Sequence, residues 1–208
     1  MSTETVFANN AAWAAAIQKD QPDFFEKLAQ GQDPDFLFIG CADSRVPAAQ
    51  IMGLGPGDVF VHRNVANLVN HTDVNVQSVI EYAVAHLGVR HVVVCGHSGC
   101  GGVNAALSDA DLGALNPWLR VIKDVYRAHQ DELEKLDSAD RAKRLIELNV
   151  EAQCLNVAKT TAVQAAWRDG EGPQIHGWVF HLDTGLIQDL EVDVDVQKGA
   201  LQRAFGVA

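Results

Sequence analysis

Three short apolar runs in the first half of the chain have the pattern of buried β-strands. They are residues 35–39, 58–62 and 91–95. Continuous rather than alternating hydrophobicity is typical of strands that are covered on both faces. Two later runs, residues 174–182 and 186–190, flank the sequence Asp183-Thr184-Gly185 and predict a strand, a turn and an edge strand.

Between and after these runs, apolar residues recur at the three- and four-residue spacing of helices. Helical spacing is found in residues 73–87, 116–129 and 138–167. Thr72 or Asp73 can cap the first of these helices, and Gly88 can end it. Another helix is expected to begin near Cys100.

The first 31 residues predict a helical arm. Residues 11–17 are alanine-rich behind Asn10, which can cap a helix, and a second helix is expected to begin at Pro22 and end at Gly31. The arm also carries the aromatic residues Trp13, Phe24 and Phe25. Because this is more apolar surface than a peripheral helix needs, we expect a dimer or a higher assembly.

Strands that alternate with helical segments predict an α/β fold. We expect a mostly parallel central sheet with helices on both faces, an added edge strand and the N-terminal helical arm. The chain has 208 residues and no convincing linker, so a single domain over residues 1–208 is expected, with residues 1–31 as the arm.

Charge and composition narrow the classes of partner. The net charge of -11, with no basic patch to offset it, argues against a nucleic-acid partner. No apolar run approaches the roughly 20 residues that cross a bilayer, and the N-terminus lacks the features of a secretory signal. We therefore expect a cytoplasmic protein with no membrane partner, in which cysteines are thiols or metal ligands rather than disulfides.

Metal-competent side chains follow two of the predicted strands. Cys41 comes directly after the first apolar run, and His97 and Cys100 come directly after the third. If these strands are neighbours, the three side chains meet at one edge of the sheet. Two thiolates and an imidazole suit Zn²⁺, and three protein ligands leave a fourth position open, as in a catalytic site. The sequence thus predicts one zinc ion per chain.

Other residues near this predicted site allow more than one role. Asp43 could be a fourth ligand, a base or an acceptor that orients hydroxide on the metal, and Arg45 could hold it by a bidentate bond. The alternative is that Asp43 and Arg45 form an ordinary ion pair on the surface, which would contribute little. Cys95 ends a valine run and Cys154 lies within a predicted helix, so both are interpreted as packing residues.

Four motifs carry a resemblance to a known family. They are residues 41–45 (CADSR), 62–67 (HRNVAN), 81–83 (EYA) and 96–102 (GHSGCGG). In this combination the chain resembles the β-class carbonic anhydrases over roughly residues 20–190. The resemblance implies that Cys41, His97 and Cys100 are zinc ligands and that Asp43 and Arg45 form a catalytic dyad.

The resemblance also implies a substrate pocket and a reaction. The residues at the family's pocket positions are Gln32, Phe60, Val65, Tyr82 and Gly101, several of which reach in from a partner subunit of a homodimer or homotetramer. The implied reaction is the reversible hydration of carbon dioxide to bicarbonate by hydroxide on zinc. His62 or His71 could carry the released proton, although each is as readily a structural or surface histidine.

Two other functions remain open on the sequence alone. A hydrolase of carbon disulfide or carbonyl sulfide could use the same zinc site. A non-enzymatic zinc-binding or redox-sensing module is also compatible with the thiols. Metal analysis combined with an assay of carbon dioxide hydration separates these possibilities.

Overall fold

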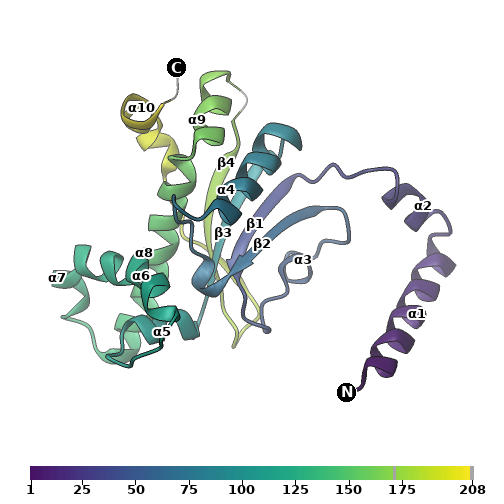
Figure 1. Ribbon diagram of the computed structural model, residues 1–208, viewed down its shortest axis with the longest axis horizontal. Coiled ribbons are helices and arrows are strands. Elements are labelled where there is room, and N and C mark those ends of the chain that lie inside the picture. The colour runs from purple at the N-terminus through teal and green to yellow at the C-terminus, as the bar shows by residue number, and fades with distance from the viewer. Residues whose placement is uncertain (171, 207–208) are drawn as a thin grey trace. The chain divides into compact units, whose positions relative to one another are not determined.

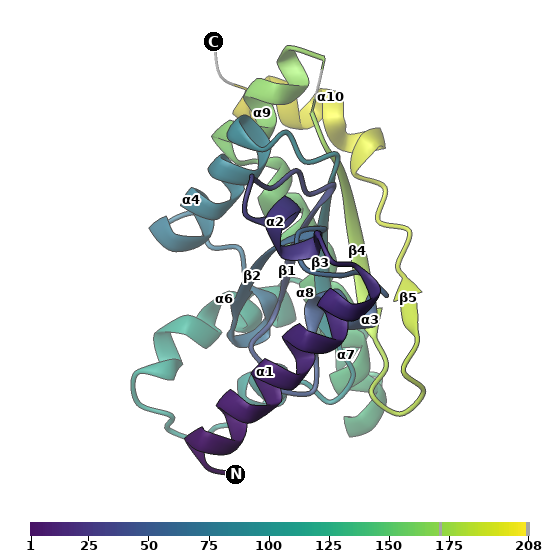
Figure 2. The same ribbon diagram turned by 90° about the vertical axis from the view of Figure 1, so that its right-hand side faces the viewer.

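The computed structural model describes residues 1–170 and 172–206, which divide into two units, residues 1–33 and residues from 34 onward. The second unit contains a five-stranded sheet, whose order is β2-β1-β3-β4-β5 (Figure 1). The strands are β1 (Phe36–Cys41), β2 (Val59–Asn64), β3 (His91–His97), β4 (Gln174–Phe180) and β5 (Ile187–Asp189). β1 pairs in parallel with β2 and β3, and β3 pairs in parallel with β4. β5 is antiparallel to β4 and lies at one edge of the sheet (Figure 2).

The predicted mostly parallel sheet with an added edge strand is therefore confirmed. The first three strands begin within one residue of their apolar runs, but each continues two residues beyond the run. Their polar ends still pair, since Cys41 lies opposite Asn64 and His97 lies opposite Phe180. These extra residues carry the candidate ligands to the very edge of the sheet.

Helices cover the two faces of the sheet unequally. The α-helices of the second unit are α3 (Ala48–Ile51), α4 (Val74–Glu81), α5 (Gly101–Ala106), α6 (Leu115–Ala128), α7 (Gln130–Leu133), α8 (Ser138–Ala158), α9 (Thr161–Arg168) and α10 (Val194–Phe205). Figure 1 shows α5, α6, α8 and α9 on one side and α3 on the other. The main core includes Leu37, Ile39 and Val94 on the first face, and a smaller cluster includes Phe38 and Val93 on the second.

Several predicted helix limits were wrong. The single helix expected over residues 138–167 is broken between Ala158 and Thr161, and Thr160 is the N-cap of the second part. The helix expected over residues 73–87 does begin behind Asp73, which accepts a hydrogen bond from the Asn75 amide. Its last turn is a π-helix, η2 (Tyr82–His86). Helices α3, α7 and α10 were not anticipated.

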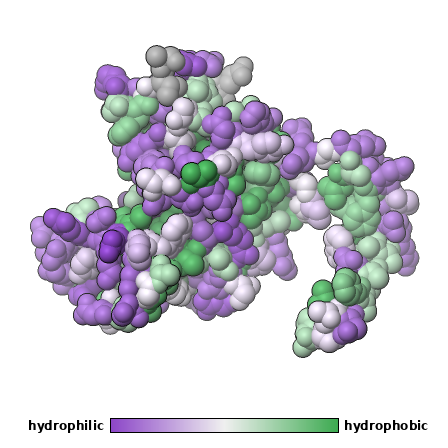
Figure 3. Space-filling model, in the orientation of Figure 1, coloured by the Kyte–Doolittle hydropathy of each residue, from purple (hydrophilic) through white to green (hydrophobic). Residues whose placement is uncertain are grey.

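The N-terminal unit consists of α1 (Thr3–Asp20) and α2 (Phe24–Leu28). The prediction that a helix begins at residue 11 was wrong, because Ser2 caps α1 by accepting a hydrogen bond from the Thr5 amide at 3.3 Å. The helices contact each other through Trp13 and Phe25, whose rings are 5.5 Å apart. No residue of α1 is buried, and Figure 3 shows hydrophobic surface mixed with polar surface along this segment.

Within residues 1–170 and 172–206, no helix combines the length and the apolar character that crossing a bilayer demands.

Candidate metal centre

The topology brings the three predicted ligands together at the C-terminal edge of the sheet. β1 and β3 are adjacent and parallel, with Gly40 opposite Cys95, so both strands end at the same edge. Cys41 is the last residue of β1, His97 is the last residue of β3, and Cys100 is the N-cap of α5. The two sulfur atoms are 3.9 Å apart, and the three ligand atoms all lie within 4.8 Å of one another. This group could hold a metal ion.

The turn between β3 and α5 depends on glycine. Gly99 has a φ of 64°, a conformation that L-residues adopt at a penalty and glycine adopts freely. Gly102 lies so close to the neighbouring loop that a Cβ there would be 2.9 Å from Val65 Cγ1 and 3.0 Å from Ala66 Cβ. Glycine at these positions lets the chain turn sharply between His97 and Cys100 and brings α5 against the loop that follows β2.

His97 is oriented with one ring nitrogen directed away from solvent and left without a hydrogen-bond partner. Its side chain is fully buried, and Nδ1 lies 3.0 Å from the Ser98 carbonyl oxygen. Because a carbonyl oxygen only accepts, Nδ1 carries the proton, and Nε2 has a free lone pair. In the part of the chain that the structure describes, Nε2 is buried and has no partner. A metal ion is the ligand that such a nitrogen suits.

The two thiols share one negative charge in the absence of a cation. The neighbouring Cys100 thiol lowers the pKa of Cys41, assisted by hydrogen bonds from the backbone amides of Ala66 and Asp43. The hydrogen bond to Cys41 raises the pKa of Cys100 well above its ordinary value, and burial adds to this. A divalent cation between them would stabilise both thiolates, so the electrostatics and the donor set favour the same occupant.

Asp43 and Arg45 form a tight pair beside this cluster. Arg45 donates from Nε to Oδ1 at 2.9 Å and from Nη2 to Oδ2 at 2.7 Å, while its backbone amide also donates to Oδ1. These bonds hold the pKa of the Asp43 carboxyl well below its usual range. Asp43 Oδ2 lies 3.7 Å from His97 Nε2. The carboxylate is thus kept ionised at the mouth of the cluster.

Arg63 fixes the segment that carries Asp43. Its Nε donates to the Cys41 carbonyl oxygen at 2.9 Å, and its Nη2 donates to the Asp43 carbonyl oxygen at 2.5 Å. Arg63 belongs to the motif of residues 62–67 that carries the family resemblance. Its place beside Cys41 and Asp43 could not be inferred without knowing that β2 and β1 are neighbours.

The predicted pocket residues fall into separate groups. Val65 packs near the start of α5, where Gly101 is the first residue, and its side chain is 36% exposed. Phe60 and Tyr82 contact each other, with ring centroids 5.7 Å apart. Gln32 belongs to the N-terminal unit. The pocket role of all five residues stays a prediction.

The remaining cysteines and histidines differ from the cluster residues in their surroundings. Cys95 and Cys154 are fully buried, and burial raises the pKa of Cys95 to about 12. His62 is only 6% exposed, and burial lowers its pKa, so it is poorly suited to exchange protons with solvent. His71 is exposed. His86 is also exposed, and its ring packs on Tyr82 with centroids 5.5 Å apart.

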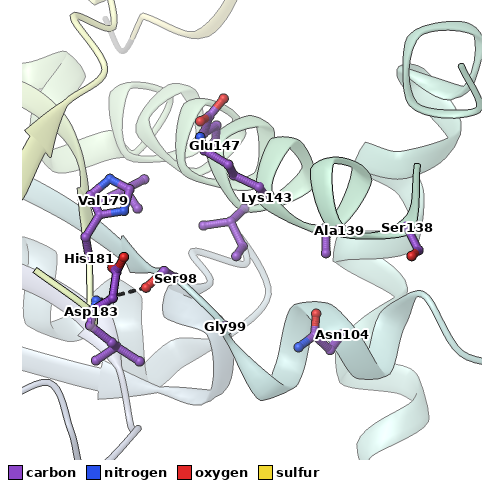
Figure 4. Close-up of a pocket in the computed structure, with 13 residues that line it drawn as sticks. Ser98, Gly99, Asn104, Ser138, Ala139, Lys143, Glu147, Val179, His181 and Asp183 are labelled. Carbon is purple, nitrogen blue, oxygen red and sulfur yellow. Dashed lines mark hydrogen bonds between the residues drawn. The ribbon is translucent and has the colours of Figure 1, made fainter. Parts of the chain in front are cut away.

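A cavity of about 720 Å³ lies beside the turn between β3 and α5. Figure 4 shows it between α8, represented by Lys143 and Glu147, and the ends of β3 and β4, represented by Ser98 and His181. Ser98 accepts a hydrogen bond from the Leu182 amide at 2.9 Å on this side. None of the three metal-competent side chains lines the cavity. It is therefore distinct from the candidate centre.

Comparisons with known proteins cover nearly the whole chain. The family described as carbonic anhydrase matches residues 36–187. A carbonic anhydrase of Emericella nidulans is 53% identical over an alignment of 201 positions, which covers 94% of this chain and 88% of that protein. A carbonic anhydrase of Candida albicans is 35% identical over an alignment of 191 positions, which covers 90% of this chain and 67% of that protein.

Solved structures show the same likeness in three dimensions. The β-carbonic anhydrase CafA of Aspergillus fumigatus has a TM-score of 0.94 and 39% identity, and 99% of each chain is covered. One of two tetrameric β-carbonic anhydrases of Sordaria macrospora has a TM-score of 0.86 and 44% identity, covering 90% of this chain and 96% of that one. The similarity therefore extends well beyond the residues of the metal cluster.

Proposed function

Because this chain belongs to the β-carbonic anhydrase family, we propose that it hydrates carbon dioxide reversibly to bicarbonate at a Zn²⁺ ion held by Cys41, His97 and Cys100. The observation that carries the zinc assignment is the convergence of these donor atoms within 4.8 Å, all buried. The orphaned His97 Nε2 and the charge-sharing thiols fit a soft divalent cation. When bound, Zn²⁺ would lower the pKa of a water molecule and supply a nucleophile near neutral pH.

The role proposed for Asp43 is to accept a hydrogen bond from that nucleophile and orient it. Its carboxylate can only accept while it stays ionised, and Arg45 favours the ionised form through two charge-assisted bonds. The same bonds restrain the carboxylate from turning onto the metal and becoming a fourth ligand. Arg63 supports this arrangement by binding the Asp43 carbonyl oxygen.

The apolar pocket residues suit an uncharged substrate. We propose that Val65 and Gly101 line the carbon dioxide site near the ligands, and that pocket residues among Phe60, Tyr82 and Gln32 reach such a site from a partner subunit. Carbon dioxide carries no net charge, so its binding site needs no charged side chain. Hydrocarbon and aromatic side chains can line the site and exclude water from it.

A homodimer or homotetramer is proposed as the assembly. The support is the exposed apolar surface of α1, where Phe7 is 75% exposed and Trp13 is 46% exposed. The similar Sordaria macrospora protein is described as tetrameric. Light scattering at micromolar protein measures the mass, and a stable, active monomer would contradict the proposal.

The decisive experiment for the function combines metal analysis with stopped-flow measurement of carbon dioxide hydration. We expect about one zinc per chain and hydration that is lost on removal of the metal and recovered on its return. Bound zinc without hydration activity would contradict the proposed reaction. It would favour a hydrolase of carbon disulfide or carbonyl sulfide, or a non-enzymatic zinc-binding module, and assays with those two substrates separate the alternatives.

A further inference from the structure

The loop of residues 64–69, here called the β2 loop, has a strained backbone in the interior of the protein. Ala66 and Asn67 are consecutive non-glycine residues with φ of 65° and 50°. Both are buried, with exposed fractions of 0% and 1%. L-residues rarely adopt this left-handed conformation, so the surroundings must hold it in place.

Three amide side chains on one face of α8 supply that support. We call Asn149, Gln153 and Asn156 the amide ladder. Asn149 Nδ2 donates to the Ala66 carbonyl oxygen at 3.1 Å. Gln153 Oε1 accepts from the Val69 amide at 2.9 Å, and Asn156 Nδ2 donates to the Val69 carbonyl oxygen at 3.1 Å. The spacing of four and three residues places all three amides on one side of a helix.

The three amides of the ladder also form hydrogen bonds with one another. Gln153 Nε2 donates to Asn149 Oδ1 at 3.1 Å, and Asn156 Nδ2 also donates to Gln153 Oε1 at 3.1 Å. Asn149 is 1% exposed and Gln153 is fully buried. Burying amides is unfavourable unless their hydrogen bonds are made, and an apolar residue would pack this helix face without that requirement. The amides on this helix face are therefore explained by their hydrogen bonds to the β2 loop.

The β2 loop in turn contacts a candidate ligand. The Ala66 amide donates to Cys41 Sγ at 3.4 Å, and Ala66 is the same residue whose carbonyl oxygen Asn149 binds. Trp118 Nε1 donates to the Val65 carbonyl oxygen at 2.8 Å and restrains the loop from the other side. The Ala66 N–H belongs to the same peptide unit as the Val65 carbonyl, which Trp118 holds, and Asn149 holds the next peptide unit through the Ala66 carbonyl oxygen. With both units restrained, the Ala66 N–H keeps its direction toward the sulfur.

We propose that the amide ladder is a positioning device for the metal centre. It holds the β2 loop so that the Ala66 N–H stays on Cys41 Sγ and the Val65 side chain stays beside the start of α5. A hydrogen bond on a thiolate ligand withdraws charge from it and fixes its direction, which sets the strength and geometry of metal binding. Asn149, Gln153 and Asn156 touch neither metal nor substrate, so they are positioning residues. This inference rests on the proposed zinc site.

The test compares ladder variants with a buried amide elsewhere. Asn149→Leu and Gln153→Met remove the ladder bonds at nearly constant volume. Gln164→Met is the matched control, because Gln164 is equally buried at 1% exposure and its Nε2 donates to the Ala158 carbonyl oxygen rather than to the β2 loop. Each protein is measured for zinc affinity by chelator competition, for thermal stability, and, after replacement of zinc by cobalt, for the sulfur-to-cobalt charge-transfer band.

We expect Asn149→Leu to weaken zinc binding by about 10-fold, the range seen when groups that orient a ligand are removed. The charge-transfer band should move to lower energy, because a thiolate without its hydrogen bond gives up charge more readily. Gln153→Met should shift both readouts in the same direction by less. Gln164→Met should leave both unchanged, whatever its thermal stability.

Two results would overturn the inference. One is zinc affinity and a cobalt band in both ladder variants that match the wild type. The other is that both ladder variants fail to fold while Gln164→Met folds, which would assign the ladder to folding alone. Failure of the proposed function is seen separately, as a wild-type protein that binds no zinc or hydrates no carbon dioxide.

Discussion

The buried cysteines fall into two pairs that differ in what surrounds them. Cys41 and Cys100 lie at the edge of the sheet, where backbone amides and each other's sulfur atoms are within hydrogen-bonding distance and a ring nitrogen of His97 lies within 4.8 Å. Cys95 lies among Phe38, Val93 and other apolar side chains, and Cys154 lies in the main core. All four are nearly inaccessible, with exposed fractions between 0% and 5%.

Burial therefore does not distinguish a metal ligand from a packing residue in this chain. The difference is the supply of groups that stabilise a thiolate. Cys41 is the last residue of β1, whereas Cys95 lies two residues before the end of β3, opposite Gly40. Because side chains alternate between the two faces of a sheet, Cys95 packs with Phe38 and Val93 on the second face, and its sulfur lies in hydrocarbon.

The largest expected effect comes from exchanging one cysteine of each pair for alanine. Cys100→Ala removes a thiolate from the proposed zinc site, so we expect loss of zinc and a fall in carbon dioxide hydration of at least about 10³-fold. Cys95→Ala should keep one zinc per chain and most of the activity. Zinc content by mass spectrometry and stopped-flow rates measure both; a Cys95→Ala protein that loses its metal would break the distinction between the pairs.

The next effect concerns the ion pairs at opposite ends of the same strand. Asp43 lies just beyond the end of β1 and pairs with Arg45, and Asp35 lies just before its start and pairs with Arg90 at 2.5 Å. Asp43→Asn should lower kcat/KM by about 100-fold, the order of a lost acid–base or orienting group, without loss of zinc.

Asp35→Asn is the matched control for that measurement. It breaks a more exposed pair far from the ligands, so kcat/KM should stay within about 2-fold of wild type. Equal losses in the two variants would show that Asp43 acts through folding rather than at the reacting atoms.

A smaller contrast is expected in the reactivity of the thiols after removal of the metal. The neighbouring Cys100 thiol lowers the pKa of Cys41, so its reactive thiolate persists to lower pH than that of an ordinary cysteine. Burial raises the pKa of Cys95 to about 12, so it stays protonated. At about pH 6.5, below the usual thiol pKa, Cys41 should be alkylated at least about 10-fold faster than Cys95. Peptide mass spectrometry measures the ratio, and equal rates would contradict the contrast.

The smallest expected effect concerns Cys95, one of the two packing cysteines, and the free energy of unfolding. Cys95→Ala should lower the free energy of unfolding by about 1–2 kcal/mol, since it removes a small buried group from a packed cluster. Cys95→Ser should be less stable than Cys95→Ala, because it leaves a hydroxyl among apolar side chains. Urea unfolding of the metal-loaded proteins provides the values; a Ser variant as stable as the Ala variant would indicate a polar environment at this position.

The strand pattern, together with the types of residue at the strand ends, predicted the sheet and the Cys41, His97 and Cys100 cluster. Continuous apolar runs placed Cys41 and His97 after two strands, and the parallel arrangement of those strands made their ends coincide. The chemistry of the side chains then selected the metal. Adjacency of the strands was the one assumption, and the order β2-β1-β3-β4-β5 confirms it.

The parts that sequence reasoning missed depend on contacts between distant segments. Asn149 and Gln153 lie within the single helix expected over residues 138–167, and helical spacing alone gives no sign that their partners are in the β2 loop more than 80 residues earlier. The helix break at Thr160 was hidden by continuous helical spacing on both sides. At the N-terminus, Asn10 suggested a cap although Ser2 had already begun the helix.

The most direct test of the central claim is the coordination of the metal in solution by X-ray absorption at the zinc edge. The account predicts two sulfur ligands at about 2.3 Å and the remaining ligands nitrogen or oxygen at about 2.0–2.1 Å. The sulfur signal should be unchanged in Cys95→Ala, because that variant keeps both proposed thiolate ligands. A wild-type spectrum with three or four sulfur ligands, or with none, would contradict the assignment of Cys41, His97 and Cys100.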